Sequence, residues 1–326
     1  MLMNPDIVAL GELLIDFTTV AADEGGYPTM AAHPGGAPAN FLAAATRCGL
    51  RTALLGKVGA DAFGRLLVNT LRQAGIDTRG IVQDEGVFTT LAFVTLDEQG
   101  DRDFSFARKP GADTCLRPEE LALGLIDGAK VFHFGTLSLT DEPVRTATRQ
   151  AVAYAKAQGK LITYDPNLRR PLWADMDAAR QQLLWGLAQA DVVKISDEEA
   201  EFLFGEGVTP QQAAQTVLAQ YGAKLVFVTC GAAGCWFANG RAAGMVPALP
   251  GVTPVDTTGA GDIFGGSAVA QLLQTGKAPQ QLDEDELRRI TRYACAAAGL
   301  STQAAGGISS VPDPQQVLQA AARYEE

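Results

Sequence analysis

The segment DTTGAGDIFGG, at residues 256–266, places one carboxylate directly after a run of very small residues. Gly259, Ala260 and Gly261 leave the backbone amides uncovered, and the apolar residues after Asp262 predict that a helix begins here. The first N–H groups of a helix lack partners and carry partial positive charge, so they can bind an oxyanion. We predict that these small residues hold a phosphoryl group while Asp262 takes the proton of the hydroxyl that attacks it. In the alternative interpretation, Asp262 only compensates the helix dipole.

A second group of polar residues lies early in the chain. GELLID at residues 11–16 ends a predicted strand with Asp16, and GGAPAN at residues 35–40 is a bare turn that leads into a helix with Asn40 near its start. Open α/β sheets bind ligands at the carboxyl ends of their strands. Asp16 and Asn40 offer the acceptors and donors that vicinal hydroxyls of a sugar require. Taken singly, each fits a turn residue or a helix cap equally well.

Three further segments follow predicted strands: DPNLR at 165–169, KISDEE at 194–199 and VTCGAAG at 228–234. In the first, Asp165 and Asn167 again lie at a strand's carboxyl edge. The carboxylates of the second either interact with a helix N-terminus or hold Mg²⁺ through water. The third is a strand running into a glycine turn, which suits a backbone that approaches a flat nucleotide. No GxxxxGK[ST] or GxGxxG motif is present, so these two phosphate-binding routes are excluded.

Short apolar runs alternate along the chain with longer amphipathic segments, a pattern that predicts a parallel sheet covered by helices. The predicted strands are residues 7–10, 53–55, 130–134, 161–164, 192–195 and 225–229. The predicted helices are residues 40–48, 64–73, 143–157, 178–190 and 210–221. No linker-like or repeated segment divides the chain, so we expect residues 1–326 to form a single α/β domain.

One region interrupts this alternation. Residues 89–96 and 102–107 are two alternating runs joined by a glycine-bearing turn at 97–101, which predicts a hairpin. With residues 17–20 and 27–32 they form a small antiparallel sheet outside the main layer. We interpret the segments at about 17–34 and 88–110 as a lid that excludes water from a phosphoryl group; the alternative is a surface excursion.

The bulk composition excludes several classes of protein. The 326 residues are 47% hydrophobic and 19% charged, with a net charge of −11 and no Lys/Arg cluster, which excludes a nucleic-acid surface. The five cysteines form no CxxC motif and are expected to be reduced thiols. Two histidines are too few for a histidine metal site, and His133 is expected in the core. Acidic residues interrupt the N-terminal apolar stretch and no apolar run could span a bilayer, so we expect a cytoplasmic protein without a membrane partner.

Taken together, these segments resemble the ribokinase-like (PfkB) carbohydrate kinases over nearly the whole chain. The GG-x-x-x-N box at residues 35–40 and the DTTGAGD box at 256–262 are similar to the family's two signatures. The resemblance implies a doubly wound, mostly parallel α/β sheet flanked by helices, with a small β lid. It also implies ATP, Mg²⁺ and a monovalent cation, usually K⁺.

The same resemblance assigns roles to individual residues. Asp262 is the implied base and Gly259, Ala260 and Gly261 the anion hole. The implied sugar ligands are Asp16, Gly35, Gly36, Asn40 and Arg108, the last reaching in from the lid, with Asp165 and Asn167 at the neighbouring strand end. The implied nucleotide and Mg²⁺ residues are Lys194, Glu199, Thr229, Gly231, Gly234 and Ala298. The implied K⁺ ligands are Asp256, Thr258, Ser301, Ala304, Gly306 and Ser310.

Two further features bear on the subfamily. The family's N-x-x-E box here has Ser196 in place of Asn, which puts nucleotide contact at that residue in question. Ala37-Pro38 stands where ribokinases have Lys, and the segments FSFARKPGAD and DPNLRRPLW are similar to fructokinases. We therefore expect an ATP-dependent sugar kinase that phosphorylates a primary hydroxyl, most similar to a fructokinase.

Several alternatives stay open. They are 2-keto-3-deoxygluconate kinase, whose substrate carboxylate Arg108 would also bind, then ribokinase or a nucleoside kinase, and a non-catalytic sugar-binding protein. A nicotinamide-dependent oxidoreductase is disfavoured because no glycine-rich fingerprint follows the first strand. Exposed lid strands would permit a homodimer.

Overall fold

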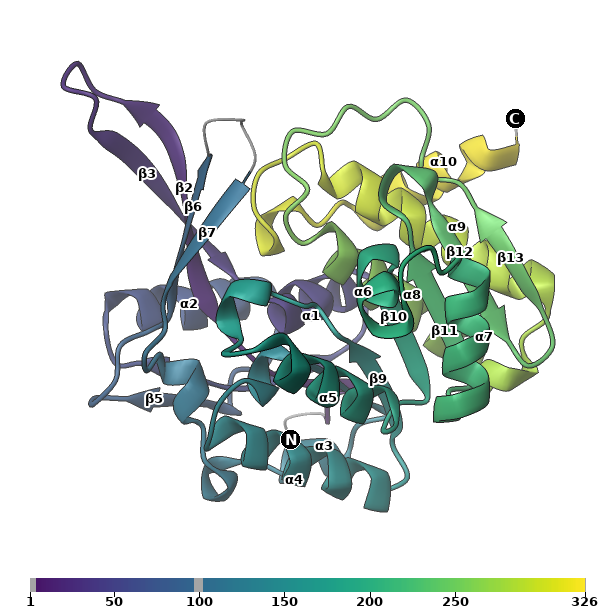
Figure 1. Ribbon diagram of the computed structural model, residues 1–326, viewed down its shortest axis with the longest axis horizontal. Coiled ribbons are helices and arrows are strands. Elements are labelled where there is room, and N and C mark those ends of the chain that lie inside the picture. The colour runs from purple at the N-terminus through teal and green to yellow at the C-terminus, as the bar shows by residue number, and fades with distance from the viewer. Residues whose placement is uncertain (1–3, 97–101, 326) are drawn as a thin grey trace.

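The computed structural model describes residues 4–96 and 102–325, and its main element is a nine-stranded sheet (Figure 1). The strand order is β13-β12-β11-β10-β9-β8-β1-β4-β5. Every pair from β11 to β5 is parallel, and β12 and β13 add an antiparallel edge. The strands are β1 (Ile7–Leu10), β4 (Thr52–Gly59), β5 (Ile81–Asp84), β8 (Val131–Gly135), β9 (Leu161–Asp165), β10 (Val192–Ser196), β11 (Leu225–Thr229), β12 (Cys235–Asn239) and β13 (Ala243–Val246).

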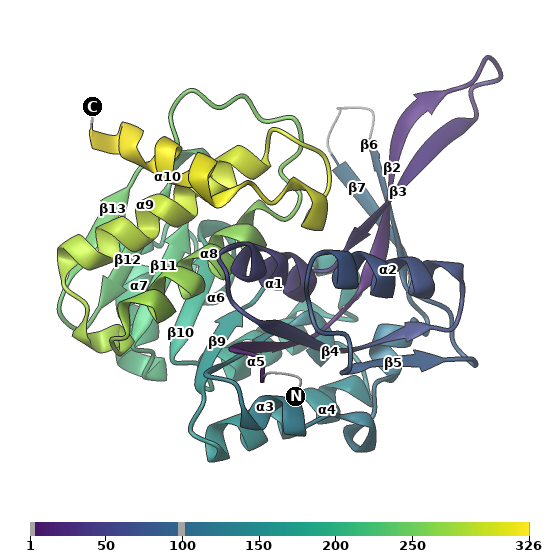
Figure 2. The ribbon, with the colours of Figure 1, turned by 180° about the vertical axis from the view of Figure 1, so that it is seen from behind.

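Helices cover both faces of this sheet, which confirms the predicted doubly wound α/β architecture (Figures 1 and 2). One face packs against α4, α5, α6 and α7, and the other against α1, α2, α8 and α9. The helices are α1 (Ala37–Arg47), α2 (Ala62–Gln73), α3 (Gly124–Asp127), α4 (Val144–Ala157), α5 (Met176–Leu187), α6 (Asp197–Phe204), α7 (Pro210–Tyr221), α8 (Ala260–Thr275), α9 (Glu284–Ser301) and α10 (Pro314–Ala322).

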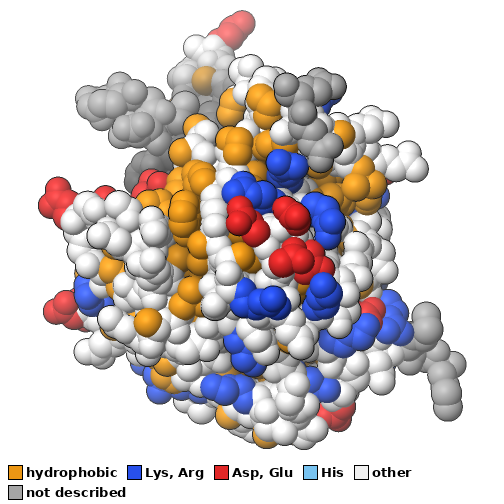
Figure 3. All heavy atoms as spheres, turned by 90° about the vertical axis from the view of Figure 1, so that its right-hand side faces the viewer, with side chains coloured by type: hydrophobic (Ala, Val, Ile, Leu, Met, Phe, Trp, Pro, Cys, Tyr) orange, Lys and Arg blue, Asp and Glu red, His pale blue; other side chains and the backbone are white. Residues whose placement is uncertain are grey.

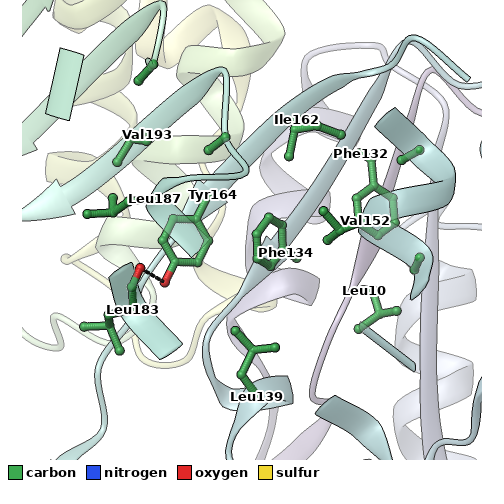
Figure 4. Packing of buried hydrophobic residues seen from close by; sticks show 14 of the residues in the cluster. Leu10, Phe132, Phe134, Leu139, Val152, Ile162, Tyr164, Leu183, Leu187 and Val193 are labelled. Atoms are coloured by element: carbon green, nitrogen blue, oxygen red, sulfur yellow. Dashed lines mark hydrogen bonds between the residues drawn. The ribbon is translucent and has the colours of Figure 1, made fainter. Parts of the chain in front are cut away.

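Alternate side chains of the central strands enter opposite cores because successive residues of a strand point to opposite faces. Figure 4 shows Phe134 and Tyr164 of β8 and β9 beside Leu183 and Leu187 of α5, with the Tyr164 hydroxyl donating to the Leu183 carbonyl at 3.4 Å. On the opposite face, His133 is buried and its ring stacks on Phe41 of α1, with centroids 3.7 Å apart. Burial lowers the pKa of His133 to about 3, so it is a neutral core residue, as the sequence predicts.

A second, four-stranded sheet projects from the main body in the order β3-β2-β6-β7 (Figure 1). Its strands are β2 (Leu14–Ala22), β3 (Pro28–Gly35), β6 (Leu91–Leu96) and β7 (Arg102–Ala107). The small sheet predicted outside the main layer is thus present, and each of its two hairpins is antiparallel. The two hairpins are joined by a parallel pair, β2 with β6. The turn predicted at residues 97–101 lies outside the described residues.

The surface charge, the length of the helices and the state of the cysteines can be compared with the composition. On the face shown in Figure 3, Lys and Arg side chains intermix with Asp and Glu, so that face carries no uniformly basic patch. Within the described parts of the chain, none of the helices has the length and apolar character needed to cross a bilayer. All five cysteines are unpaired.

Candidate active site

A cleft of about 810 Å³ lies at the carboxyl ends of β10 and β11 and extends to the base of the small sheet. Residues from both ends of the chain line it. Of the predicted site residues, the lining includes Asp16, Gly36, Asn40, Asn167, Lys194, Glu199, Thr229, Gly231, Asp256, Thr258, Gly259, Gly261, Asp262 and Gly306. It does not include Gly35, Arg108, Asp165, Gly234, Ala260, Ala298, Ser301, Ala304 or Ser310.

Asp262 lies in the first turn of α8, and both of its carboxylate oxygens accept hydrogen bonds. The amide nitrogen Nδ2 of Asn40, on α1, donates to Oδ2 at 2.9 Å, and Nδ2 of Asn167, after β9, donates to Oδ1 at 3.0 Å. Burial raises the pKa of Asp262, and the hydrogen bond from Asn40 and the charge of Lys194 oppose that rise. The side chain is 8% exposed and lines the cleft, so it has the position that a proton acceptor needs.

The helix start beside Asp262 has the open backbone that the sequence predicts. Gly259 caps α8 with φ 77°, a left-handed conformation that favours glycine, and no side chain caps this end of the helix. A Cβ at Gly261 would lie 2.9 Å from Nζ of Lys194, so that ammonium group stands directly beside the first amides of α8. The N–H of Ala260 donates to the Thr257 carbonyl at 3.3 Å, so the amides of Gly259 and Gly261 and the lysine beside them are the groups that can form an anion site.

Lys194 reaches this position from β10 and pairs with Asp165 at the end of β9, with Nζ and Oδ2 3.1 Å apart. Burial works against its charged form, but the carboxylates of Asp165, Glu199 and Asp262 outweigh burial and raise the pKa of Lys194 to about 12. Burial also raises the pKa of Asp165. Asp165 thus holds the lysine from behind rather than lining the cleft itself.

The opposite end of the cleft is built where β2 and β3 meet α1. Asp16 of β2 lies opposite His33 of β3 in the strand register. At Gly35, a Cβ would overlap the Asp16 carboxylate, so this position requires glycine. Gly36 has φ 126°, and a Cβ would overlap the backbone carbonyl of Glu12. Burial raises the pKa of Asp16 to about 6. Gly35 therefore brings the β3 backbone close to Asp16, Gly36 brings the start of α1 close to the Glu12 carbonyl, and Asp16 lines the cleft.

Glu12 and Arg169 are among the lining residues that the sequence did not predict for the site. Glu12 accepts a hydrogen bond at Oε1 from the N–H of Ala37, at 2.8 Å, and so caps α1, whose own N-cap residue is a glycine. Burial raises the pKa of Glu12 to about 7. Arg169 lines the cleft and its charge opposes the raised pKa of Asp16. Both could have been found from the sequence. Glu12 lies in the segment at 11–16 that was selected for Asp16, and Arg169 lies in the segment at 165–169 that was selected for Asp165 and Asn167.

Arg108 occupies a different place from the one expected. It follows β7, is buried, and donates from Nε to Asp113 at 2.8 Å and from its terminal nitrogens to Thr140 and to the carbonyl of Leu137, at 2.8 and 2.9 Å. Its guanidinium thus joins the base of the small sheet to the main body, beside the cleft rather than among its lining residues.

Ser196 and Glu199 together form the start of α6. The Ser196 hydroxyl accepts from the Glu199 N–H at 3.1 Å, and Oε2 of Glu199 accepts from the Ser196 N–H at 2.9 Å, a reciprocal capping box. Oε1 of Glu199 accepts from the N–H of Leu168 at 2.7 Å. The serine at this position is thus a sound helix cap, and Glu199 ties α6 to the segment after β9.

The predicted nucleotide residues separate into two groups. Thr229 and Gly231 lie at the end of β11 and line the cleft. Gly234 has φ 108°, and a Cβ there would overlap the Val246 carbonyl, so its glycine serves the close approach of β12 to β13. Ala298 lies in α9, against the core cluster of α8 and α9.

The predicted cation residues lie in two segments, one before α8 and one that runs from the end of α9 to Ser310. Oδ1 of Asp256 accepts from the N–H of Thr258 at 2.9 Å, and Oδ2 accepts from the N–H of Gly306 at 3.0 Å. The backbone N–H groups of Val255 and Asp256 donate to the carbonyl of Thr302. The carboxylate therefore fastens the loop before α8 to the segment that carries Ser301, Ala304 and Ser310.

Comparisons with known proteins agree with this geometry. A model of the pfkB family carbohydrate kinases matches residues 4–314. Fructokinase-2 of Solanum lycopersicum is 42% identical over 316 residues, which cover 96% of this chain and 94% of that protein. Fructokinase with bound ATP from Xylella fastidiosa has a TM-score of 0.90 and 31% identity, covering 99% of this chain and 100% of that one. Fructokinase from Vibrio cholerae O395, solved in a fructose, ADP and calcium ion bound form, has a TM-score of 0.85 and 30% identity, covering 96% and 98%. The chain therefore belongs to the pfkB family of carbohydrate kinases and is a sugar kinase.

Proposed function

We propose that this chain is an ATP-dependent fructokinase that transfers the γ-phosphoryl group of ATP to a primary hydroxyl of fructose. The observation that carries the proposal is the position of Asp262 beside the open amides and lysine of one anion site, in a cleft that also contains Asp16 and Asn40. Relatives over almost the whole chain are named fructokinases, and one was solved with fructose and ADP. Fructose is proposed as the sugar because these relatives are named fructokinases and because the cleft contains the polar side chains of Asp16 and Asn40.

In this proposal the sugar oxygen attacks the γ-phosphorus, the bond from that phosphorus to the bridging oxygen of ADP breaks, and the hydroxyl proton passes to Asp262. The amides of Asn40 and Asn167 favour the ionised carboxylate that accepts this proton. The amides of Gly259 and Gly261 and the ammonium of Lys194 stabilise the charge on the moving phosphoryl group.

Asp16, Gly35, Gly36 and Asn40 are proposed to bind the sugar. Asn40 lines the cleft, where its Nδ2 donates to Asp262 and its Oδ1 is buried against Gly307, so its amide stands at the sugar end beside the proposed base. Arg108 would act indirectly, through its contacts at the base of the lid, because its donors are engaged by Asp113, Thr140 and Leu137.

Thr229 and Gly231 are proposed to border the nucleotide, while nucleotide contacts at Gly234 and Ala298 stay predictions. Among the described residues, no group of three His, Cys, Asp or Glu side chains could hold a metal ion. The donor set therefore fits Mg²⁺ held mainly by phosphates and water, with Glu199 nearby, which is how this ion commonly binds in kinases. When bound, Mg²⁺ neutralises phosphate charge.

The loops of Asp256 and Gly306 fit a monovalent cation. Ser301 and Ser310 are buried, the Asp256 carboxylate joins the two segments through Thr258 and Gly306, and the segments contain hydroxyl and carbonyl oxygens. Oxygen donors of this kind suit K⁺. We propose K⁺ here, where it would steady the backbone before Gly259.

The small sheet, with segments about 17–34 and 88–110, is proposed as a lid, and residues 1–326 as one domain that includes it. Val20 on β2 and Tyr27 before β3 are 61% and 73% exposed. Exposed apolar side chains on the β2–β3 hairpin favour association, so we propose that two copies pair through their lids. Sedimentation of the wild type and of Tyr27→Glu tests the pairing. A cytoplasmic location stays a prediction.

The test is an ADP-release assay with Mg²⁺ over fructose, ribose, 2-keto-3-deoxygluconate and a nucleoside, each with and without K⁺. We expect turnover with fructose above the other three. Turnover chiefly with 2-keto-3-deoxygluconate, ribose or the nucleoside would replace fructose by that substrate.

The variant Asp262→Asn separates a kinase from a sugar-binding protein. It should keep fructose binding, measured by calorimetry, and lose turnover by about 10³-fold or more, because a positioned base typically contributes about 10²–10⁴-fold. Equal turnover by this variant, or ADP release that does not depend on any sugar, would refute the assigned reaction.

A further inference from the structure

The side chain of Asn167 lies between the end of β9 and the start of α8, in contact with Asp262. Its Nδ2 donates to Oδ1 of that carboxylate at 3.0 Å, while Asn40 donates to Oδ2. Each oxygen of the carboxylate thus receives one amide N–H, from elements on different sides of the cleft. The two donors together fix the plane of the carboxyl group.

The backbone of Asn167 is held in an unusual conformation. Its φ is 47°, and no other non-glycine residue in the described ranges has a positive φ. The residues on either side are anchored: the carbonyl of Pro166 accepts from the N–H of Thr136 at 3.3 Å, and the N–H of Leu168 donates to Glu199 at 2.7 Å. Asparagine tolerates this conformation better than most residues, and such conformations persist where their surroundings impose them.

This geometry changes the role first predicted for Asn167, that of a sugar ligand. The residue is only 8% exposed, and its amide donates to Asp262, the proposed base. An amide donor favours the ionised carboxylate and, unlike a lysine, carries no charge that would compete with the anion site. The side chain therefore acts on the reaction through Asp262.

We propose that Asn167 is a positioning residue that holds Asp262 at the angle from which it accepts the sugar proton. The inference rests on the proposed function, because it requires Asp262 to be the base. The twisted backbone at position 167 aims the amide, and the carboxylate cannot rotate away from the cleft without losing this hydrogen bond or the one from Asn40.

The test uses two variants that tolerate a positive φ but lack the amide donor, Asn167→Asp and Asn167→Gly. Asn167→Gly should lower kcat by about 10- to 100-fold, the effect of losing a hydrogen bond to a charged group, with the fructose KM changed by no more than about threefold. Asn167→Asp should lower kcat at least as much, because it also places a like charge beside Asp262. Asn69→Asp, at an exposed position on α2, is the matched control and should leave kcat unchanged.

Two kinetic results would overturn the inference. If the Asn167 variants have a raised fructose KM and an unchanged kcat, Asn167 is a sugar ligand. If neither value changes, Asn167 has no role in the reaction. In either case a wild type that phosphorylates fructose and an inactive Asp262→Asn leave the proposed function standing. A wild type inactive on all four substrates would instead refute the proposed function.

A second measurement does not depend on turnover. The midpoints of urea unfolding are compared for the wild type, Asn167→Gly, Asp262→Ala and the double variant. If the two side chains hold each other, the shift of the double variant will be clearly smaller than the sum of the two single shifts. Additive shifts would show that the residues act independently and would overturn the inference.

Discussion

Gly261 offers a substitution that should damage the reaction without damaging the fold. It lies in the first turn of α8, where a Cβ would stand 2.9 Å from Nζ of Lys194 and would approach no other atom apart from the Lys194 Cε at 3.5 Å. The end of a lysine side chain can move, so Gly261→Ala should be accommodated. Alanine in place of glycine favours a helix by about 0.5–1 kcal/mol, which offsets a weaker Lys194–Asp165 pair. We expect the free energy of unfolding to stay within about 1 kcal/mol of the wild type.

The effect on catalysis should be much larger. The new methyl group would stand at the proposed anion site and would displace the Lys194 ammonium there. Removal of one donor from an oxyanion site costs about 10²–10³-fold in kcat, so we expect a loss of about 100-fold for Gly261→Ala. The assay is coupled ADP release with fructose at saturating ATP, beside urea unfolding of the same samples.

Gly266, one and a half turns further along α8, is the matched control. A Cβ there would overlap the backbone carbonyl of Phe41, which cannot move without shifting α1, and Gly266 does not line the cleft. Gly266→Ala should therefore lose about 1–3 kcal/mol of stability, as overpacking usually does, while its folded fraction keeps most of its kcat. Full activity in Gly261→Ala, or a loss that merely follows its stability, would refute the anion-site reasoning.

Three further predictions follow from the same geometry. Burial raises the pKa of Asp16 to about 6, so its carboxylate is lost as pH falls through 6, and the fructose KM should rise there; Asp16→Asn should have a high KM that no longer depends on pH in this range. Ser196→Ala removes the cap of α6 and should cost about 1 kcal/mol in urea unfolding and raise the ATP KM through Glu199, whereas Ser196→Asn, an equally good cap, should do neither. Replacing K⁺ by tetramethylammonium should lower kcat. Asp256→Asn should lower kcat by about tenfold and abolish the response to K⁺, since the hydrogen bond from Gly306 is weakened. A K⁺ response retained by that variant would place the cation elsewhere.

The parallel sheet was predictable because strands buried on both faces are continuous apolar runs, as in VFHFG and LVFVT. The short strands β5, β12 and β13 were missed, since runs of only four or five residues carry too little alternation to be recognised. The pairing within the small sheet was not predictable either. Its parallel contact joins Ile15 to Leu91, far apart in sequence, and alternation shows which residues face the core but not which strand lies beside them.

The site was predictable where glycines and carboxylates form compact motifs, as at residues 35–40 and 256–262. In these motifs, Gly36 and Gly259 have a positive φ and close contacts that only glycine permits. The direction of Arg108 could not be predicted, because its partners, Asp113 and Leu137, are fixed by packing at the base of the lid. For the same reason, Asn167 was assigned to the sugar rather than to Asp262.

The hydrogen bond between Asn40 and Asp262 joins residues 222 positions apart. During synthesis, α1 and the sugar end of the cleft leave the ribosome long before α8 is made. A growing chain therefore lacks the proposed proton acceptor and the proposed anion site until α8 has been made and has folded against α1. Phosphotransfer thus requires synthesis of the chain at least through α8.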